Sequence, residues 1–448
     1  MKRLALKVPT LPNIVILGVA LRLILLTYAM FVPEISYDGD SHEYLELAHH
    51  LAETGVYGAE TDRPFPPDSV RPPLYPAFVA FFAFLLGDGT PFLALLVQVL
   101  LSAGAIWLTH RLARQLGASD WIARLAALVL ALDVSSVIYA TTLMTETLFT
   151  VLLLLFASAL VRTLKVPDRR NNLALAVLSA GLILTKPIAS YLPLVSAGLL
   201  LWLAHERTAQ KALAAVAHLA LVAALVLPWA LRNERKHDFF GVSTIQSFNL
   251  LYYNSALAKA RAEGTGIDAA EDALTATLQQ RIDLGSASTG EQAQAMQRLG
   301  WQTIARYPGN YAMLHLRGML AMLVDPGRIN LERVLYGAPG KSGLLEAFST
   351  QGTTGAMVLL LRQQPALLIV FAAVFLWQIA LLSMNAIGGI ALFAKRQPIL
   401  FWTLFSLIAY FLLTTGPLGA ARFRVPVTPY LAIIAGYGAE RLRQKLLP

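Results

Sequence analysis

Apolar runs close to bilayer thickness recur along the whole chain, and they constrain the fold more than any other feature. Runs of roughly 17 to 25 residues cross the hydrocarbon core as helices. Such runs predict ten spans, near residues 13–32, 91–109, 120–138, 142–161, 171–185, 187–204, 212–231, 366–393, 398–415 and 426–440. With 56% apolar and 14% charged residues in 448, the chain has more apolar surface than one soluble core buries. We therefore predict an all-α polytopic membrane protein.

The basic residues lie in short clusters between these runs, and the positive-inside rule uses them to predict orientation. The clusters that fall on one side are Lys2, Arg3 and Lys7; Arg111 and Arg114; Arg162, Lys165, Arg169 and Arg170; Arg207 and Lys211; Lys395 and Arg396; and Arg441, Arg443 and Lys445. That side is predicted to be the cytoplasm, with both termini in it. The pattern accounts for the net charge of +9 without a nucleic-acid partner. The Ala- and Leu-rich bias favours a bacterial inner membrane.

One apolar stretch, Leu74–Leu86, is too short to be counted as a span. It has about 13 residues, and Pro73 and Pro76 stand at its start, where a helix tolerates proline. Counting it as a span would also move the cluster Arg162 to Arg170 to the outer side. We expect this stretch to lie in the outer membrane interface.

This topology predicts three parts. Residues 1–231 form an N-terminal transmembrane module whose first outer loop, 33–90, carries the chemistry. Residues 232–365 form an outer-face helical segment, in which Asn254 to Arg306 is expected to give amphipathic helices broken near Gly285 to Gly290. Residues 366–448 form the C-terminal transmembrane helices. The chain has no cysteine, which excludes disulfides, thiol catalysis and Cys-ligated metal.

Carboxylates cluster where the first predicted span leaves the membrane. The loop opens with Tyr37-Asp38-Gly39-Asp40-Ser41-His42-Glu43-Tyr44, and a short amphipathic helix is predicted to follow. One interpretation gives Asp38, Asp40 and Glu43 a chemical role. The alternative makes Ser41 or Asp40 the helix cap, with Glu43 favoured in the first turn by the helix dipole.

Two further charged residues stand at positions that need an explanation. Arg71, in Arg71-Pro72-Pro73-Leu74-Tyr75-Pro76, is able to bind a phosphate in a bidentate fork, or else to reach lipid headgroups. Glu146 lies about one turn inside an apolar run, where a carboxylate facing lipid costs on the order of 2.5 to 3.5 kcal/mol. It is therefore expected to face a polar cavity, or else to pair with a nearby arginine.

Cations also occur on the outer side, where the positive-inside rule does not favour them. They are Lys186, in Leu184-Thr185-Lys186-Pro187, and Arg422 and Arg424, in Arg422-Phe423-Arg424-Val425-Pro426. Headgroup anchoring is the alternative role for one of them. Arg22, midway through the first span, is expected to pair with another helix. Carboxylates that activate an acceptor and cations that hold a departing phosphate are what sugar transfer from a phospholipid donor needs.

In this order and topology, these pieces resemble bacterial members of the GT-C superfamily of glycosyltransferases, related to protein O-mannosyltransferases and to lipid A aminoarabinose transferases. The matching pieces are Arg22, Asp40 to Leu45, Arg71 to Pro76, Leu143 to Phe149, Leu184 to Pro187, Phe239 to Asn254 and Arg422 to Pro426. The resemblance implies a GT-C-like bundle of about ten helices with interfacial helices. It also implies a sugar donor carried on a polyprenyl phosphate and inversion at the anomeric carbon.

The resemblance also implies roles for individual residues. Asp40 is the expected general base, with Asp38 as its less certain neighbour. Arg71 is expected to bind the donor phosphate, with Lys186, Arg424 and Arg422 completing the charge neutralisation. The expected sugar or acceptor pocket contains Glu146, Glu43 and Tyr75. Many relatives have a second acid directly after the first-loop acid, whereas here Ser41 follows Asp40, so Asp38 or Glu43 is the candidate substitute.

Other partners and functions stay open at this point. The acceptor is a glycolipid, a glycan or a protein, and the donor link is a phosphate or a diphosphate. No cofactor is implied with certainty and a divalent metal is left open, because the sequence has no compelling ligand set and His42, His49 and His50 fit an interfacial helix. The main rival is a transporter or flippase for a lipid-linked or anionic substrate, with Glu146, Arg22 and Lys186 on its pathway. A non-catalytic membrane scaffold would leave the acidic loop unexplained.

Overall fold

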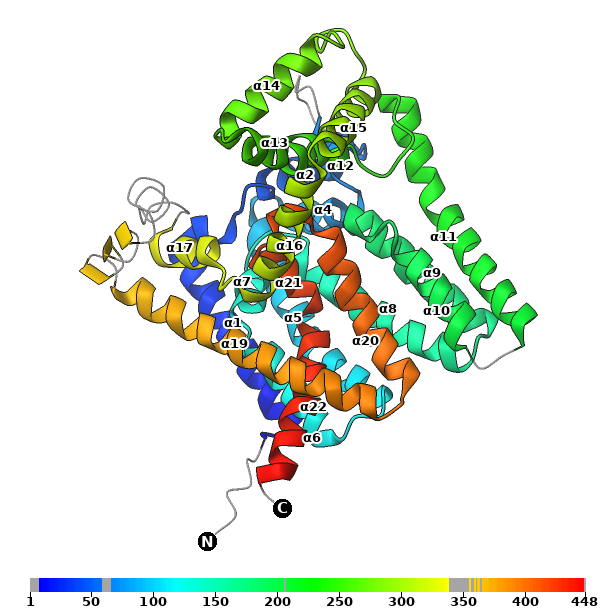
Figure 1. Ribbon diagram of the computed structural model, residues 1–448, viewed down its shortest axis with the longest axis vertical. Coiled ribbons are helices and arrows are strands. Elements are labelled where there is room, and N and C mark those ends of the chain that lie inside the picture. Colours follow the sequence, from blue (N-terminus) through cyan, green and yellow to red (C-terminus); the bar gives the residue numbers. More distant parts are fainter. Residues whose placement is uncertain are drawn as a thin grey trace.

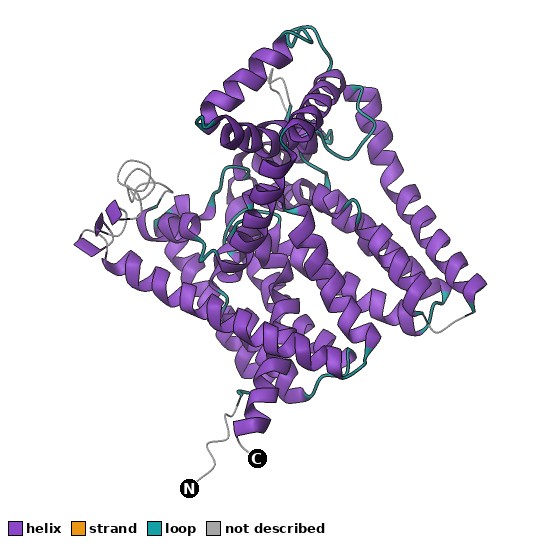
Figure 2. Cartoon of the chain, viewed as in Figure 1, coloured by secondary structure: helices purple, strands orange, loops and turns teal. Residues whose placement is uncertain are grey.

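The computed structural model describes residues 8–58, 66–204, 207–337 and 365–446, and the short helical pieces 354–355, 358–359 and 361–362. Within these ranges the chain forms helices joined by turns and loops, without a strand (Figure 2). The predicted all-α fold class is confirmed.

Each of the ten predicted spans contains a helix. The helices are α1 (Leu11–Phe31), α5 (Thr90–Gln115), α6 (Asp120–Leu132) with α7 (Val134–Ala140), α8 (Glu146–Lys165), α9 (Arg169–Thr185), α10 (Leu192–Leu203), α11 (Thr208–His237), α19 (Pro365–Ala394), α20 (Pro398–Thr414) and α22 (Thr428–Leu446). Among the described residues, five of them, α1, α5, α8, α11 and α19, are long and apolar enough to cross a membrane alone. The pair α6 and α7, bent by 60°, makes a sixth candidate.

The stretch Leu74–Leu86 forms α4, a helix of 13 residues that packs against α2 (Ser41–Thr54). Tyr75 and Val79 face the protein, while Phe81 and Phe84 are exposed on the other side. A short helix with one buried and one exposed apolar face suits the membrane interface that the sequence predicts for it.

Helix α8 lies at the centre of the bundle. It packs against α5 and α9, and Phe149, Phe156 and Leu160 on it are almost fully buried. In Figure 1, α1 begins and α22 ends at the lower end of the molecule, and α13 (Ala256–Glu263), α14 (Ile267–Gln279) and α15 (Thr289–Arg306) lie at the opposite end. The first residue of α8, Glu146, pairs with Arg422 in the segment between α20 and α22, so the first turn of α8 lies beside that segment.

The segment that the sequence predicts to face outward contains a set of helices, which we call the outer-face helices. They are α12 (Ile245–Phe248), a π-helix (Asn249–Ser255), α13 (Ala256–Glu263), α14 (Ile267–Gln279), α15 (Thr289–Arg306), α16 (Pro308–Val324) and α17 (Arg328–Tyr336). Leu251, Leu274 and Leu299 belong to a separate small core among them. The expected break lies between α14 and α15, where Ser288 and Glu291 form a capping box. Helix α16 then returns toward the bundle (Figure 1).

Helix α16 meets the loop after α20 at a backbone-to-backbone contact between glycines. That loop contains η5 (Gly416–Leu418) and leads into α21 (Ala421–Arg424). A Cβ atom at Gly419 would lie only 1.7 Å from the carbonyl oxygen of Gly318, and one at Gly318 would lie 2.2 Å from that of Gly416. Only glycine permits such an approach, so the outer segment and the loop before α21 are packed directly on each other.

Candidate active site

The first outer loop is fastened to the start of α8 by a serine. The Ser41 hydroxyl accepts a hydrogen bond from the backbone N–H of Asp38 (2.9 Å) and donates one to the carbonyl of Leu143 (2.9 Å). Asp40, which immediately precedes α2, makes no side-chain hydrogen bond to the helix end. The capping alternative for Asp40 therefore does not describe this structure, and its carboxylate is available for other partners.

Asp40 lies between two arginines that come from opposite ends of the sequence. Its Oδ1 atom is 2.7 Å from Nη2 of Arg71, and its Oδ2 atom is 2.8 Å from Nη2 of Arg422. Arg71 also donates through Nε to Glu43 (2.7 Å), and its guanidinium lies 5.3 Å from the ring centre of Tyr44. The Arg71 side chain is thus paired with two carboxylates of the first loop.

Glu146 begins α8 and is fully buried. Its Oε1 atom is 2.5 Å from Nε of Arg422 and 2.7 Å from Nζ of Lys186. Lys186 also lies 5.6 Å from the ring centre of Phe423. Glu146 therefore pairs with an arginine, the second of the two environments that the sequence suggests for it.

These contacts join into one row of alternating charges, which we call the charge chain. Its members, in order of contact, are Glu43, Arg71, Asp40, Arg422, Glu146 and Lys186. The structure thus brings together six of the nine site residues that the sequence singles out. Each acid in the interior of the chain touches two cations, which favours the ionised form of the acids.

The two arginines set the protonation state of Asp40. Burial alone would raise the pKa of this carboxyl, but Arg422 and Arg71 lower it from 3.8 to about 2. Asp40 is therefore ionised at neutral pH.

Asp38 lies beside the charge chain and is paired with a residue that the sequence analysis missed. Nη1 of Arg333, on α17, is 3.1 Å from Oδ2 of Asp38 and donates to the carbonyl of Tyr37 (3.2 Å). The Arg333 side chain is buried. Arg333 lies in the segment that the sequence predicts to face outward. Its backbone partner, Tyr37, is 296 residues away in the sequence.

Two of the expected site residues have other partners. Arg424 is buried and donates through Nη1 to the carbonyls of Met322 (2.9 Å) and Asp325 (2.8 Å), at the C-terminal end of α16. Tyr75 is buried and donates to Oε1 of Gln98 (2.7 Å). The structure therefore places Arg424 against a helix end and Tyr75 behind the first loop, outside the charge chain. Arg22 is bonded to neighbouring helices, as expected, through Ser102 on α5 and the carbonyl of Ala131 on α6.

A second charged cluster adjoins the charge chain and was also missed from sequence. Asp68, in α3 (Pro67–Val70), is buried and accepts hydrogen bonds from Lys236 (2.7 Å), His237 (3.2 Å) and Arg232. Burial would raise the pKa of Asp68, but His237, Lys236 and Arg232 hold it well below its ordinary value. This cluster ties the outer end of α11 to the first loop.

Tyr57 connects the second cluster to the charge chain. Its carbonyl accepts from Nη2 of Arg232 (2.7 Å), and its hydroxyl donates to the carbonyl of Arg71 (2.9 Å). Arg71 is thus supported from both its side chain and its backbone.

Histidines in the first loop are engaged with neighbouring groups. His42 stacks on Tyr37, with ring centres 5.5 Å apart, and Nδ1 of His50 lies 2.9 Å from the carbonyl oxygen of Val56. In the part of the chain that the structure describes, no group of three or more His, Asp or Glu side chains is arranged to hold a metal ion.

Part of this chain matches a known protein family. A family model described as dolichyl-phosphate-mannose-protein mannosyltransferase matches residues 70–231, a little over a third of the chain. The matched part includes Arg71, Glu146 and Lys186 of the charge chain. A comparison with curated proteins gives no match.

The fold is similar to that of solved membrane enzymes. The apo oligosaccharyltransferase of Archaeoglobus fulgidus has a TM-score of 0.54 at 11% identity, over 98% of this chain and 50% of that one. AglB of the same organism, in complex with an inhibitory peptide and a dolichol-phosphate, has a TM-score of 0.53 at 12% identity, over 97% and 50%. ArnT from Cupriavidus metallidurans in the apo state has a TM-score of 0.38 at 14% identity, over 95% and 77%. The chain thus spans about half the length of the oligosaccharyltransferase whose fold it shares.

Proposed function

We propose that this chain, a multi-pass membrane protein with the fold of the GT-C glycosyltransferases, transfers a sugar from a polyprenyl-phosphate donor to an acceptor hydroxyl. The reaction takes place on the outer, periplasmic face of a bacterial inner membrane and inverts the anomeric carbon. Asp40 acts as the general base. The family match over residues 70–231 supports sugar transfer, and the dolichol-phosphate in the AglB complex supports a lipid-phosphate donor.

The observation that carries this proposal is the position of Asp40 between Arg71 and Arg422. The carboxylate of Asp40, the proposed base, lies 2.7 and 2.8 Å from the two guanidinium groups proposed to bind phosphate. The base and these cations are therefore in direct contact. Arginine forks bind phosphate oxygens in a bidentate manner and neutralise charge that develops there. One small site therefore contains both the proton acceptor and the phosphate-binding groups that the transfer needs.

The donor phosphate competes with the carboxylates for these cations. Its oxygens take over part of the hydrogen bonding of Arg71 and Arg422, while Lys186 adds a further positive charge from the far side of Glu146. The polyprenyl tail lies in the surrounding lipid. Cations on the phosphate then stabilise the negative charge that the leaving group carries as the C1–O bond breaks.

Donor binding also makes Asp40 a better base. In the donor-free protein its two arginines hold its pKa at about 2, which favours the carboxylate and makes it a weak proton acceptor. When phosphate shares the arginines, this lowering decreases and the proton affinity of Asp40 rises. The acceptor hydroxyl oxygen attacks C1 of the sugar from the face opposite the phosphate, and its proton passes to Asp40.

The test compares purified wild type with Asp40→Asn and a matched control, Glu53→Gln. Glu53 is an exposed carboxylate on the same helix, α2, away from the charge chain. Each protein is offered a panel of polyprenyl-phosphate sugars with a lipid extract of the host as acceptor, and release of polyprenyl phosphate is measured. We expect wild type and Glu53→Gln to be active, and Asp40→Asn to lose on the order of 10²- to 10⁴-fold in turnover.

Two results would contradict the proposal. Turnover by Asp40→Asn close to that of wild type removes Asp40 from the role of base. No release by wild type with any donor, together with movement of a lipid-linked substrate across liposomes, identifies the chain as a transporter.

A further inference from the structure

One guanidinium bridges two carboxylates of the charge chain. Arg422 lies 2.8 Å from Asp40 through Nη2 and 2.5 Å from Glu146 through Nε. A guanidinium is planar and rigid, so its donor atoms reach both carboxylates only if these are kept at a suitable separation. Asp40 and Glu146 belong to different segments of the chain. Their separation therefore depends on how those two segments are fastened to each other.

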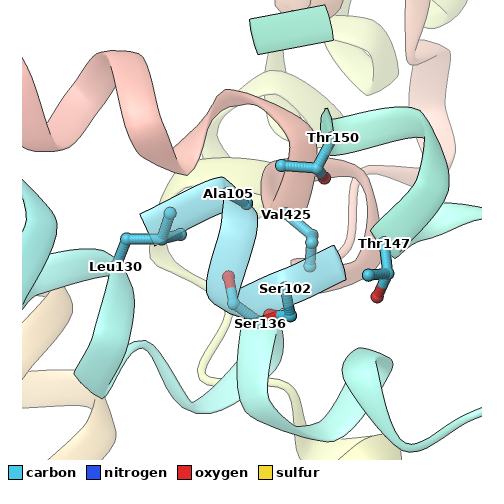
Figure 3. Close-up of a pocket in the computed structure, with 7 residues that line it drawn as sticks. All are labelled: Ser102, Ala105, Leu130, Ser136, Thr147, Thr150 and Val425. Carbon is cyan, nitrogen blue, oxygen red and sulfur yellow. The ribbon is translucent and has the colours of Figure 1, made fainter. Parts of the chain in front are cut away.

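Glu146 and Arg422 adjoin segments that are packed in the bundle. Thr147, which follows Glu146 in α8, and Val425, three residues after Arg422, line the same small pocket together with side chains of α5, α6 and α7 (Figure 3). The hydroxyl of Thr147 also donates to the carbonyl of Tyr139 in α7 (3.0 Å). Both charged residues thus follow or precede buried positions, whereas Asp40 lies in the turn before α2 and needs to be fixed from elsewhere.

The turn that contains Asp40 is bound by Arg333 of α17. Nη1 of Arg333 donates to the carboxylate of Asp38 (3.1 Å) and to the carbonyl of Tyr37 (3.2 Å). Asp38 accepts, at Oδ1, from the backbone N–H of Gly39 (2.9 Å). Because the Arg333 side chain is only 2% exposed, solvent ions screen this ion pair little. Arg333 therefore fixes both the backbone and a side chain of the turn.

The same arginine reaches the segment that leads into Glu146. Nη2 of Arg333 donates to the hydroxyl of Thr142 (3.4 Å), four residues before Glu146, and to Oδ1 of Asn330 (3.3 Å). These two contacts are long, so each is weak alone. Thr142 is fixed in turn, because its carbonyl accepts from Nε2 of Gln98 on α5 (2.8 Å). One buried side chain thus joins the turn of the first loop to the segment before α8.

We propose that Arg333 and Asp38 form a positioning pair for Asp40. The pair fixes the turn of the first loop, so that Arg422 can bridge the carboxylates of Asp40 and Glu146. Asp38 acts through Asp40 and does not itself take the proton of the acceptor. Because α17 is one of the outer-face helices, the segment after α11 contributes a residue to the site. The effect on turnover rests on the function proposed above.

The structural part of the proposal is tested without any substrate. Hydrogen exchange of the full chain in nanodiscs is measured by mass spectrometry for wild type, Arg333→Gln and the matched control Arg298→Gln, an exposed arginine on α15. In wild type, the N–H of Asp38 donates to the Ser41 hydroxyl and the N–H of Ser41 to the carbonyl of Asp38. We expect the peptide covering residues 36–44 to exchange at least about fivefold faster in Arg333→Gln, and at the wild-type rate in the control.

The positioning role is tested by separating kcat from KM. We expect Arg333→Gln to lower kcat about tenfold, because a small displacement of the base from its productive position slows proton transfer. The KM for the donor should stay within about twofold, because Arg71, Arg422 and Lys186 all remain. Arg333→Lys keeps a charge for Asp38 and should recover at least about threefold over Arg333→Gln. Turnover is expressed per phosphate-binding site, so that loss of folded protein does not count as loss of kcat.

A double-mutant cycle tests whether the two residues act as a pair. Asp38→Asn keeps an oxygen for the N–H of Gly39 but removes the charge that faces Arg333, so we expect kcat to fall about three- to tenfold, less than for Asp40→Asn. The double variant Asp38→Asn/Arg333→Gln should lose no more than about twofold beyond the larger single loss, because both substitutions remove the same contact. If Arg333→Gln does not fold, hydrogen exchange of Asp38→Asn is compared with the same control.

Each experiment has a result that overturns its part of the proposal. Wild-type exchange of residues 36–44 in Arg333→Gln shows that this arginine does not fix the turn. Wild-type kcat in that variant removes the positioning role, and independent, additive losses in the cycle remove the pair. A loss in Asp38→Asn as large as that in Asp40→Asn makes Asp38 a direct participant in proton transfer. If wild type proves inactive as a transferase, the exchange rates still decide whether Arg333 fixes the turn.

Discussion

Replacing Glu146 by glutamine should make the protein less stable and at the same time improve its binding of phosphate. Glu146 is fully buried and balances two cations, Arg422 at 2.5 Å and Lys186 at 2.7 Å. Glutamine has nearly the same shape, but it cannot balance their charge. After the substitution, only Asp40 remains as a carboxylate partner of Arg422 within the charge chain.

The loss of stability follows from the burial of this cluster. Removing one partner of a buried ion pair typically costs about 3 to 5 kcal/mol, because the remaining charge is left without compensation. The glutamine oxygen still accepts one hydrogen bond, so we expect a value near the lower end, about 3 kcal/mol. The unfolding temperature of the purified protein should fall accordingly.

The gain in phosphate affinity has the same cause. If the donor phosphate binds as proposed, it has to displace the Glu146 carboxylate from Arg422 and Lys186 before it can bind these two cations. Hydrogen bonds to charged groups contribute about 1.5 to 3 kcal/mol each. If about 1.4 kcal/mol of this cost disappears, the Kd for polyprenyl phosphate falls tenfold.

The assay is binding of a short-chain fluorescent polyprenyl phosphate to wild type, Glu146→Gln and the control Glu53→Gln. A ligand without a sugar separates the effect on phosphate from any contact between Glu146 and the sugar. We expect Glu53→Gln to match wild type in both Kd and unfolding temperature. Weaker binding by Glu146→Gln, or an unchanged unfolding temperature, would refute the idea that Glu146 competes with phosphate for these cations.

Three more predictions follow from the geometry of the site. Arg71→Lys keeps the charge but loses the fork that holds Asp40 and Glu43, so the KM for the donor should rise about tenfold in a steady-state assay, and an unchanged KM would argue against phosphate binding there. Because the pKa of Asp40 is lowered from 3.8 to about 2 in the folded protein, its stabilisation is complete above about pH 4 and is lost as pH falls toward 2. The unfolding temperatures of wild type and Asp40→Asn, measured by calorimetry, should therefore differ by a constant amount between about pH 5 and 8 and converge below pH 4. Arg424→Gln should lower the unfolding temperature while leaving the KM for the donor within about twofold, since this arginine caps α16; a large rise in KM would return it to the phosphate site.

Much of the fold could be predicted because a bilayer imposes length and polarity on each span. The ten predicted spans all contain helices, and the short stretch Leu74–Leu86 forms a short helix. The 60° bend after α6 was not predicted, because it depends on Asp133 capping a second helix in the interior of an apolar run. Local sequence patterns predict where a helix lies, but they do not show where a buried polar residue interrupts it.

The candidate site was predictable in its members more than in its contacts. Asp40, Arg71, Glu146, Lys186 and Arg422 are charged residues at outer ends of apolar runs, and that position alone made them candidates. The same reasoning could not separate Arg422 from Arg424, which are two residues apart. Their side chains leave a single short helix toward different partners, and tertiary packing decides which one reaches the carboxylates.

Arg333 and Asp68 were missed for a different reason. Each lies in an outward segment with many polar residues, where a charged side chain is unremarkable. Their importance comes from partners far away in the sequence, Asp38 for Arg333 and the end of α11 for Asp68. A single sequence contains no signal for such pairs.

The glycine contact between α16 and the loop before α21 has a consequence for protein engineering. Gly318 and Gly419 press the two backbones together, and Arg422 follows only three residues after Gly419. Consider a chimera that takes its outer-face helices from another protein in order to bind a different acceptor. In such a chimera the loop before α21 would pack against a helix surface to which it is not fitted. The segment 416–424 should therefore be transplanted together with α16, as one cassette, if the graft is to keep Arg422 in register with Asp40 and Glu146.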